Sequence, residues 1–249
     1  MGTGRFRHVA LGDVGSTNDE VRHRLDLLDA GPLVITAERQ VKGRGRRGRE
    51  WVSPAGNLYA SFAYCPNVPL MRFAELSFVV AVAVAEMAEA LAGEHASIRC
   101  KWPNDVLADG AKLSGILLET ARSTAGRDAV IMGIGINVAS APTDTPYGAV
   151  ALGQLDPAIT VERVLAMLSM RLTAWTETWE TQGFAHVRSA WLAVADGLGK
   201  PVVARLADGE LHGRFDGLDV DGALLLRQGD DTIRRVTAGD VFRPTHRQD

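Results

Sequence analysis

Cysteine is scarce in this chain, and the residue spacings that bind structural metals are missing. The 249 residues include two cysteines, Cys65 and Cys100, which lie far apart in or beside apolar runs. Two separated thiols do not make a disulfide framework and are typical of a reducing compartment. The six histidines show no metal-ligand spacing, and neither HExxH nor CxxC occurs. We therefore expect buried thiols, no metal site built by the protein, and a cytoplasmic location.

A long uninterrupted apolar run and an excess of basic charge are also missing. The longest apolar stretch, 76–92, is interrupted by Glu86 and Glu89, and no segment of signal-peptide length precedes it. We therefore expect neither export nor membrane attachment. The formal net charge is −3, whereas sequence-independent nucleic-acid binders usually carry a basic surplus. With 46% hydrophobic and 23% charged residues, the chain is long enough for one large domain and a small one.

The most distinctive segment that is present is the glycine- and arginine-rich run at 38–51, ERQVKGRGRRGREW. Its glycines let the backbone approach a ligand, and its arginines offer guanidinium groups suited to phosphate or carboxylate oxygens. Taken alone, such a run is also typical of a solvated basic face or a nucleic-acid patch. Gly48 is followed by Arg49 and Glu50, so the run is not a Walker A loop. It indicates an anion-binding loop without identifying the anion.

Hydrophobic periodicity predicts a mixed α/β domain for residues 1–197. We expect helices at 16–31, 74–92 and 161–179, the last with Thr160 as its N-cap. Strands are expected at 33–37 and 58–65, and a further strand is expected to end at 101–102. Others are expected at 106–107, 112–120 and 129–138, with a hairpin turn at Asp109-Gly110.

The last part of the chain has a different pattern. After Gly199, short strands alternate with the turn dipeptides Asp208-Gly209, Asp221-Gly222 and Gly229-Asp230, and no helical period follows. Residues 198–249 are therefore expected to form a small C-terminal β-barrel.

A second segment with chemical potential runs from 101 to 119, KWPNDVLADGAKLSGILLE. Lys101 and Lys112 would each be a surface charge in most proteins, and Pro-Asn-Asp alone is an ordinary turn. Lys112, however, lies inside an apolar strand run, where an unpaired ammonium group is unfavourable. We therefore expect an anion beside Lys112.

With these segments in view, the chain resembles the biotin protein ligases, also called holocarboxylase synthetases. Five family motifs occur in order: Ser16-Thr17-Asn18, the run at 40–51, Lys-Trp-Pro-Asn-Asp at 101–105, the run at 112–119, and Gly-Ile-Gly-Ile-Asn-Val at 133–138. The resemblance covers essentially the whole chain. It implies an α/β (α+β) fold: a mixed sheet with helices on one side, followed by an SH3-like C-terminal barrel.

The family activity implied by the resemblance has two steps. The biotin carboxylate attacks the α-phosphate of ATP to give biotinyl-5′-AMP and pyrophosphate, with Mg²⁺ accompanying the nucleotide. A lysine of a biotin carboxyl-carrier domain of an acyl-CoA carboxylase then takes the biotinyl group. The implied partner is this carrier domain, and we expect a monomer or weak homodimer without nucleic-acid or membrane binding.

Carried over residue by residue, the resemblance implies three overlapping sets of site residues. The biotin-binding set is Ser16, Thr17, Asn18, Gln40, Arg44, Gly45, Arg46, Lys112 and Gly115. The ATP-binding set is Arg44, Arg46, Arg47, Arg49, Trp51, Lys101, Asn104, Lys112 and Asn137. The catalytic set is Arg44, Arg46, Asp105 and Lys112, and no metal ligand is assigned to the protein.

Several assignments have structural alternatives. Thr17 and Glu20 fit a capping box at the start of the first helix. Trp51 beside a strand is more often a core residue, and Gly115 could mark a bulge. Asp105 could serve a metal, a phosphate or the acceptor lysine.

Other functions also remain open. The chain begins its first ligase motif at Ser16, so we expect the monofunctional type without a helix-turn-helix domain. A lipoate ligase of the same fold is the nearest alternative activity. A non-catalytic nucleic-acid-binding module is a more distant one, because aromatic residues are not interleaved with the arginines.

Overall fold

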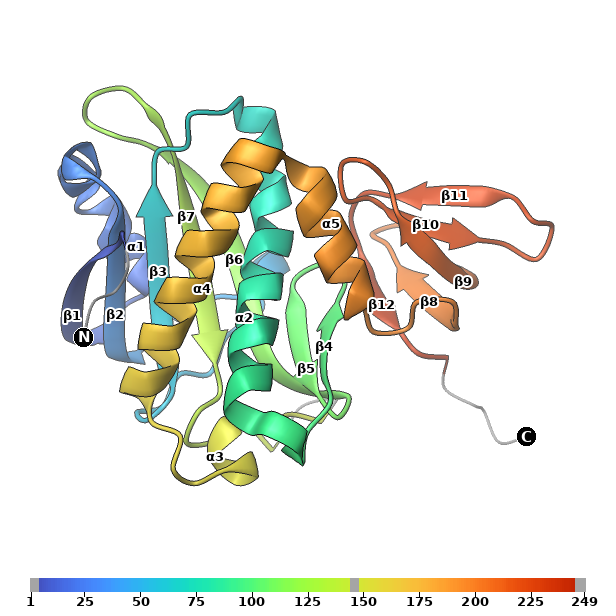
Figure 1. Cartoon of the computed structure of the whole chain (residues 1–249), viewed down its shortest axis with the longest axis horizontal. Coiled ribbons are helices and arrows are strands. Elements are labelled where there is room, and N and C mark those ends of the chain that lie inside the picture. Colours follow the sequence, from blue (N-terminus) through green and yellow to red (C-terminus); the bar gives the residue numbers. More distant parts are fainter. Residues whose placement is uncertain (1–4, 144–147, 245–249) are drawn as a thin grey trace.

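The computed structural model describes residues 5–143 and 148–244, which form a large α/β part and a small β part (Figure 1). A seven-stranded sheet is the centre of the larger part, with the order β1-β2-β3-β7-β6-β5-β4. β1 and β2 are parallel, and the other neighbours are antiparallel. The strands are β1 (Arg7–Val14), β2 (Leu33–Gln40), β3 (Leu58–Tyr64), β4 (Ile98–Lys101), β5 (Asp105–Ala108), β6 (Ala111–Arg122) and β7 (Asp128–Ile136). The predicted mixed sheet is confirmed.

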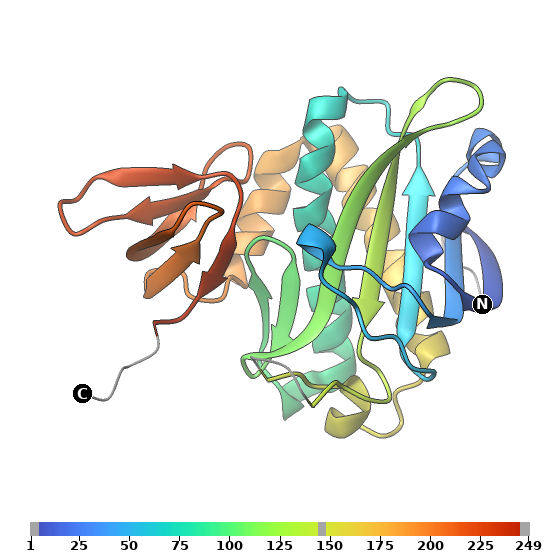
Figure 2. The ribbon, with the colours of Figure 1, turned by 180° about the vertical axis from the view of Figure 1, so that it is seen from behind.

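Helices cover both faces of this sheet, so the expectation of helices on one side is wrong. The larger layer contains α2 (Leu76–Ala92), α4 (Val161–Gln182) and α5 (Phe184–Ala193) (Figure 1). On the opposite face lie α1 (Thr17–Arg22) and the 3₁₀ helix η1 (Leu25–Ala30) (Figure 2). The remaining short helices are α3 (Leu152–Leu155), η2 (Arg46–Gly48), η3 (Leu70–Glu75) and η4 (Gly93–His95). Each face of the sheet therefore has its own hydrophobic core.

The helix α2 is the most buried element of the larger core. The helical stretch Leu70–His95 is long and apolar enough to span a membrane by length and composition, but 72% of its most apolar window is buried inside the protein. Helix α4 packs against it, and Thr160 caps α4 by accepting a hydrogen bond from the backbone N–H of Arg163 (3.3 Å), as predicted. The apolar stretch at 76–92 is thus a core helix.

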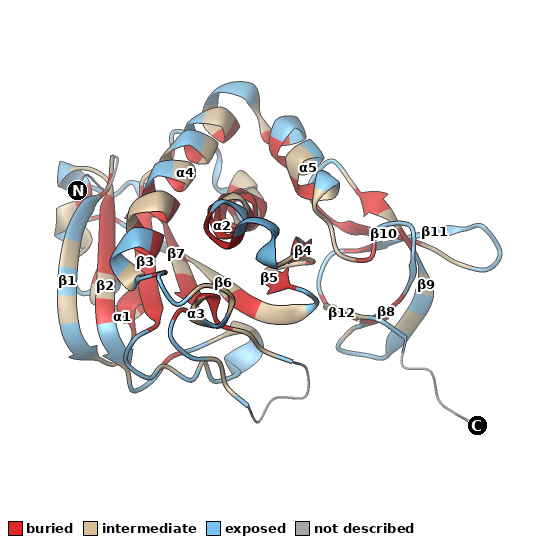
Figure 3. Ribbon diagram, turned by 60° about the horizontal axis from the view of Figure 1, so that its bottom comes forward, coloured by how far each residue is buried: buried red, intermediate tan, exposed pale blue. Residues whose placement is uncertain are grey.

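The C-terminal part is a five-stranded antiparallel sheet that curls toward a barrel (Figure 3). Its order is β11-β10-β9-β8-β12. The strands are β8 (Pro201–Arg205), β9 (Glu210–Leu218), β10 (Leu224–Arg227), β11 (Ile233–Val236) and β12 (Asp240–Phe242). The predicted turn dipeptides fall between consecutive strands. The closer likeness to an SH3 barrel stays a prediction.

The two parts share one core. Phe215 of β9 lies 6.3 Å from the ring of Trp191 on α5. The indole N–H of Trp102 donates to the carbonyl oxygen of Gly222 (3.0 Å), and Gly222 lies so close to Phe78 that a Cβ would be 2.5 Å from its ring. We propose the boundary at 197–198, which lies between α5 and β8. The shared core holds β12 next to the arginine-rich loop.

Three local predictions were wrong or incomplete. The expected helix at 16–31 is split into α1 and η1, because Arg24 leaves the helical region (φ −128°). β1 was not predicted, and none of its residues is buried. Helix α5 was not predicted either.

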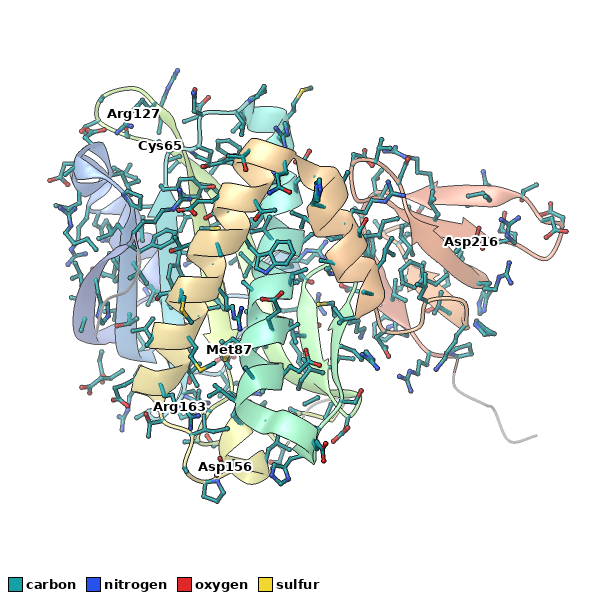
Figure 4. The ribbon with its side chains drawn as sticks, in the orientation of Figure 1. Cys65, Met87, Arg127, Asp156, Arg163 and Asp216 are labelled. Carbon is teal, nitrogen blue, oxygen red and sulfur yellow. The ribbon has the colours of Figure 1, made fainter. Side chains whose placement is uncertain are left out.

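Both cysteines are free thiols, but only one is fully buried. Cys100 lies in the larger core, whereas Cys65 is half-buried near Arg127 (Figure 4). Burial raises the pKa of both thiols. The expectation of buried thiols is therefore confirmed for Cys100 and met only in part by Cys65.

Candidate active site

One cavity brings together most of the predicted site residues. It has a volume of about 380 Å³ and lies between the start of α1, the loop at 43–51 and the strands β6 and β7. Among its lining residues are Ser16, Thr17, Asn18, Gln40, Arg44, Gly45, Arg46, Arg49, Trp51, Asn104, Asp105, Lys112, Gly115 and Asn137. Of the predicted residues, Arg47 and Lys101 do not line it.

A buried polar cluster forms one end of the cavity. The backbone N–H and the hydroxyl of Thr17 both donate to Gln40 Oε1, at 2.8 and 3.1 Å. The hydroxyl oxygen of Ser61 lies 2.7 Å from Thr17 Oγ1 and 2.5 Å from Asn18 Oδ1. Asn18 Nδ2 donates to Glu119 Oε2 (2.8 Å). Hydrogen bonds across four elements thus fix these side chains before any ligand binds.

These bonds decide between the two interpretations of Thr17. Residue Ser16 occupies the N-cap position of α1, and no side-chain capping bond is present there. The prediction of a capping box formed by Thr17 and Glu20 is therefore wrong, because the Thr17 hydroxyl donates to Gln40 instead. Ser61 was missed, although a serine in the apolar strand LYASFAY is a recognisable signal of a buried hydrogen bond.

Three glycines make room for the side chains that line the cavity. A Cβ on Gly133 would lie 2.5 Å from Asn18 Oδ1, and a Cβ on Gly135 would lie 2.4 Å from the Trp51 ring. Trp51 also covers Gly115, the cross-strand partner of Gly135. A Cβ on Gly115 would lie 2.8 Å from the Trp51 ring. The resemblance assigned Gly115 to the biotin-binding set. In this structure Trp51 occupies the space in front of it.

Trp51 is therefore a cavity wall rather than a core residue. Its Nε1 is buried and has no hydrogen-bond partner within the described residues. A buried donor without an acceptor is unfavourable, so the indole N–H is available to a ligand acceptor. Lys112 Nζ lies 5.4 Å from the centre of the same ring, within cation–π range.

The anion expected beside Lys112 is supplied by the protein. Lys112 Nζ lies 2.8 Å from Asp105 Oδ1, and both side chains are mostly buried. Asn104 holds the preceding turn by donating to the carbonyl oxygen of Ile116 (2.7 Å), and its Oδ1 accepts from Arg46 Nη1 (3.2 Å). The Lys112–Asp105 pair is thus fixed at the junction of β5 and β6.

The arginines of the loop are neutralised by carboxylates outside it. Arg44 makes two hydrogen bonds to Asp19, at 2.8 and 2.6 Å. These bonds lower the pKa of Asp19 and raise that of Arg44. The guanidinium groups of Arg46, Arg47 and Arg49 lie 3.8, 3.8 and 3.1 Å from the carboxylate of Asp240 on β12.

The loop conformation depends on its glycines and on one unusual arginine. Gly43 lies so close to the carbonyl oxygen of Trp51 that a Cβ would be 2.4 Å from it. Arg47 has a left-handed backbone (φ 56°) within η2, which turns it away from the cavity. Burial lowers the pKa of Arg46, the most enclosed of the loop arginines.

Lys101 lies on the far side of the Lys112–Asp105 pair. It borders a second cleft of about 660 Å³ between the sheet and the C-terminal part, which Asp105 and Lys112 also line. Its ammonium group is 4.8 Å from the centre of the Phe242 ring, and burial lowers its pKa. The pair Lys112–Asp105 therefore separates two cavities.

Asn137 lines the cavity while holding the backbone beneath it. Its Nδ2 lies 3.3 Å from the carbonyl oxygen of Lys112 and 3.2 Å from that of Val150. The lining residues that were not assigned from the sequence are mostly apolar or glycine: Glu50, Val52, Ile116, Leu117, Gly133, Ile134, Gly135, Pro142 and Ala149. The spacing of two between Gly133 and Gly135 was the available signal, because alternate residues share one face of a strand.

Comparisons with known proteins point to one family. The profile of the Biotin/lipoate A/B protein ligase family matches residues 14–137, and that of the Biotin protein ligase C terminal domain matches residues 197–243. The chain is 41% identical over 241 residues to a biotin–[acetyl-CoA-carboxylase] ligase of Paracoccus denitrificans, covering 93% of this chain and 98% of that protein. The chain belongs to the biotin protein ligase family.

Two further proteins show the extent of the likeness. The bifunctional ligase/repressor BirA of Escherichia coli is 34% identical over 232 residues, which are 92% of this chain and 71% of that protein. The structure of a biotin protein ligase from Aquifex aeolicus in complex with biotin and ATP has a TM-score of 0.80 and 27% identity. It covers 95% of this chain and 97% of the other.

Proposed function

We propose that this biotin protein ligase joins biotin to ATP and then transfers the biotinyl group to a lysine of a biotin carboxyl-carrier domain of an acyl-CoA carboxylase. The observation that carries the proposal is the single cavity with a preassembled polar cluster at one end and Lys112 with the loop arginines at the other. Such a cavity can hold an uncharged polar ring and an anionic group at the same time.

The polar end suits the bicyclic ring of biotin. Its ureido group has two N–H donors and one carbonyl acceptor, and each must find a partner when it is buried. Ser16, Thr17, Asn18 and Gln40 offer hydroxyl and amide groups there, and all but Gln40 are at most 5% exposed. Because Thr17 already bonds to Gln40, and Asn18 to Ser61 and Glu119, biotin would exchange some of these bonds at little cost in ordering entropy.

The cationic groups suit the first step. The biotin carboxylate forms a bond to the α-phosphorus of ATP, while the bond from that phosphorus to the bridging oxygen breaks and pyrophosphate leaves. Two anions have to approach, so cations are needed to offset their repulsion and to stabilise charge on the α-phosphoryl oxygens. We assign this role to Arg44, Arg46 and Lys112, with Gly45 giving the backbone close access.

The remaining groups suit the nucleotide. Trp51 offers an aromatic face and a buried N–H without a partner, and Asn137 lies at the same wall. Arg49 and Asn104 line the cavity and can meet phosphates there. Arg47 and Lys101 would meet phosphates only if the loop or the nucleotide reaches past the cavity. We propose Trp51 and Asn137 for the adenine side.

Magnesium would enter with the nucleotide. Within the described residues, no group of three or more His, Cys, Asp or Glu side chains could hold a metal ion. Asp105 is the carboxylate nearest the proposed phosphate position. Mg²⁺ commonly uses one carboxylate together with substrate phosphates, and in this chemistry it offsets phosphate charge. The donor set therefore fits a nucleotide-carried Mg²⁺.

In the second step a carrier lysine needs a path to the acyl carbon. Its nitrogen forms an amide bond, the bond from the acyl carbon to the phosphate oxygen breaks, AMP leaves and the amine loses a proton. The second cleft, which also reaches Asp105, offers such a path from the C-terminal part. We assign to Asp105 the acceptance of a hydrogen bond from this amine. The loop at 43–51 would exclude water from the mixed anhydride.

The decisive experiment measures pyrophosphate release with ATP and Mg²⁺ in the presence of biotin, of lipoate, and of neither acid. Biotin-dependent release, followed by labelling of a carrier domain but not of its Lys→Arg variant, is the expected result. Release with lipoate alone would indicate the lipoate ligase instead. Equal proteolytic cleavage of the loop with and without biotin and ATP would contradict its role as a lid.

The cellular setting follows from the same proposal. We propose a cytoplasmic enzyme that does not bind nucleic acid. A shift of labelled DNA at physiological salt in the presence of nonspecific competitor would contradict the second statement.

A further inference from the structure

The side chain of Asn18 bridges three strands of the large sheet at the polar end of the cavity. It lies over Gly133 of β7, where a Cβ on the glycine would be 2.5 Å from Asn18 Oδ1. Ser61 of β3 is the strand partner of Gly133 on one side, and β6 pairs with β7 on the other. The amide oxygen of Asn18 meets the hydroxyl of Ser61 (2.5 Å), and its amide nitrogen meets Glu119 of β6 (2.8 Å). The two ends of one amide are therefore held by two different strands.

Glu119 ends the recognised motif at 112–119, but neither the resemblance nor the proposed reaction gives it a role. It shares a strand face with Gly115, which lines the cavity, because alternate residues of a strand point to the same side. Its side chain is 24% exposed, and Arg22 Nη2 lies 3.6 Å from Glu119 Oε1. The other carboxylate oxygen, Oε2, accepts the hydrogen bond from Asn18. Glu119 is thus a half-buried carboxylate directly behind the polar cluster.

Glu119 determines which way the amide of Asn18 points. The hydroxyl of Ser61 can donate or accept, so it could meet either end of the amide. A carboxylate only accepts, so Glu119 holds the amide nitrogen and leaves the amide oxygen toward Ser61. The backbone N–H of Thr17 orients Gln40 in a similar way, because it only donates and therefore meets Gln40 Oε1 (2.8 Å). Both ends of this row of side chains are therefore acceptor oxygens.

The row between these two oxygens has fewer protons than contacts. It runs from Asn18 Oδ1 through Ser61 Oγ and Thr17 Oγ1 to Gln40 Oε1, with distances of 2.5, 2.7 and 3.1 Å. The two hydroxyl groups supply one proton each for these three oxygen–oxygen contacts. Lone pairs are thus in excess, and buried acceptors without a donor are unfavourable. A ligand that brings N–H donors would complete the cluster.

We propose that Glu119 is a positioning residue that makes the polar cluster selective for a ring with N–H donors, such as the cyclic urea of biotin. The inference rests on the proposed function, because it concerns the same cavity. Without Glu119 the amide of Asn18 is free to turn over, and its nitrogen would donate to Ser61. The N–H groups of the ring would then meet a donor where they need an acceptor. Glu119 does not line the cavity and acts through Asn18.

Calorimetric titration of the full chain with biotin, without ATP, tests this role. Glu119→Met keeps the length of the side chain but no longer holds the amide nitrogen. We expect the dissociation constant for biotin to rise about tenfold, as for the loss of one buried hydrogen bond. KM for ATP, measured by pyrophosphate release at saturating biotin, should not change. A general loss of structure would change both constants.

Two controls separate positioning from charge and packing. Arg22→Met removes the ion-pair partner of Glu119 but keeps the bond to Asn18. Glu86→Met removes another half-buried carboxylate, which lies on α2 and pairs with Arg171. Both variants should bind biotin as tightly as the wild type. Circular dichroism and thermal unfolding of each variant check the fold.

A pair of substitutions reverses the direction of the hydrogen bond between positions 18 and 119. Asn18→Asp alone sets two carboxylates against each other, and we expect the dissociation constant for biotin to rise on the order of 10²-fold. Adding Glu119→Gln supplies an amide nitrogen that donates to the new carboxylate, whose other oxygen again accepts from Ser61. The double variant should therefore bind biotin within about threefold of the wild type.

The possible failures are distinguishable. A wild type that binds no biotin would overturn the proposed function, and this inference with it. If the wild type binds biotin, a rise of less than about threefold for Glu119→Met would overturn only the role of Glu119. A double variant that binds no better than Asn18→Asp would overturn it as well, as would an equal loss for biotin and ATP in Glu119→Met.

Discussion

The two ends of the cavity are built on opposite principles. At the polar end, Thr17, Gln40 and Asn18 are held by hydrogen bonds to one another and to strand residues. At the cationic end, the loop arginines are held by carboxylates from other elements, Asp19 and Asp240. The first set is neutral and, apart from the half-buried Gln40, buried. The second is partly exposed and charged.

This difference implies different behaviour on binding. Buried neutral groups in a closed network keep their geometry, so the polar end can accept an uncharged ring with little rearrangement. The arginines must exchange a carboxylate for a phosphate or a biotin carboxylate, because one guanidinium face cannot serve both. We therefore expect substitutions at the polar end to act on biotin affinity and substitutions at the cationic end to act on ATP and on the rate.

The substitution that tests the cationic end most strongly is Lys112→Ala. It removes the ammonium group next to Asp105, so nothing at that position would offset the negative charge of the approaching anions. We expect biotin-dependent pyrophosphate release to fall by about 10²–10³-fold, as when one preorganised transition-state donor is lost. Lys42→Ala, an exposed lysine before the loop, is the matched control. A loss below tenfold would remove Lys112 from the catalytic set.

The wall between the two ends is tested by Gly135→Val. Any Cβ at this position would lie 2.4 Å from the Trp51 ring, so the indole must leave its place. A displaced wall misplaces the nucleotide, and we expect kcat/KM for ATP to fall on the order of 10²-fold. Gly229→Ala, at a position with open space around it, is the control. Unchanged tryptophan fluorescence and unchanged kinetics would contradict the close packing.

The glycines also show what could be predicted from the sequence. The motif at 133–138 was recognised and Asn137 was assigned, but the roles of Gly133 and Gly135 depend on what stands above them. Asn18 and Trp51 come from distant parts of the chain, and only the three-dimensional register brings them there. Residues of one continuous motif were thus predictable as a site, whereas contacts between motifs were not.

The helices and strands also divide into those that local sequence patterns predicted and those that depend on contacts between distant segments. Long periodic segments such as α2, α4 and β7 were predicted because their patterns are local and strong. β1 was missed because an edge strand buries no residue and so shows no clean alternation. Asp240 was missed as well, because nothing in the sequence around it indicates that β12 returns to the arginine loop. These features depend on tertiary packing.

The polar end is tested by Gln40→Ala. This change leaves the N–H and the hydroxyl of Thr17 without their acceptor, and one unsatisfied buried donor weakens binding by about tenfold. We expect the dissociation constant for biotin, measured by calorimetry without ATP, to rise by that factor while KM for ATP stays constant. An equal effect on both ligands would mean that the two ends are not separate.

The contribution of the C-terminal part is tested by Asp240→Asn. The side chain keeps its shape but loses the charge that faces Arg46, Arg47 and Arg49. Since surface ion pairs are weak, we expect KM for ATP to rise only about threefold and the loop to be cleaved faster by trypsin. Asp208→Asn, in the turn between β8 and β9, should change neither. Identical cleavage rates would show that β12 does not position the loop.

The weakest expected effect concerns Asp19, whose carboxylate is about one-third exposed, at 34%. The hydrogen bonds from Arg44 lower its pKa, so the folded protein favours the ionised form and gains stability above the pKa of the unfolded chain. That contribution is lost as the pH falls below about 4. The melting temperature of the wild type should therefore be slightly higher than that of Asp19→Asn at pH 7, and this difference should disappear in acid. Asp26→Asn is the control. A difference in melting temperature that grows as the pH falls would mean that Arg44 pairs with another group, and the cationic end would then be less firmly neutralised than the distances indicate.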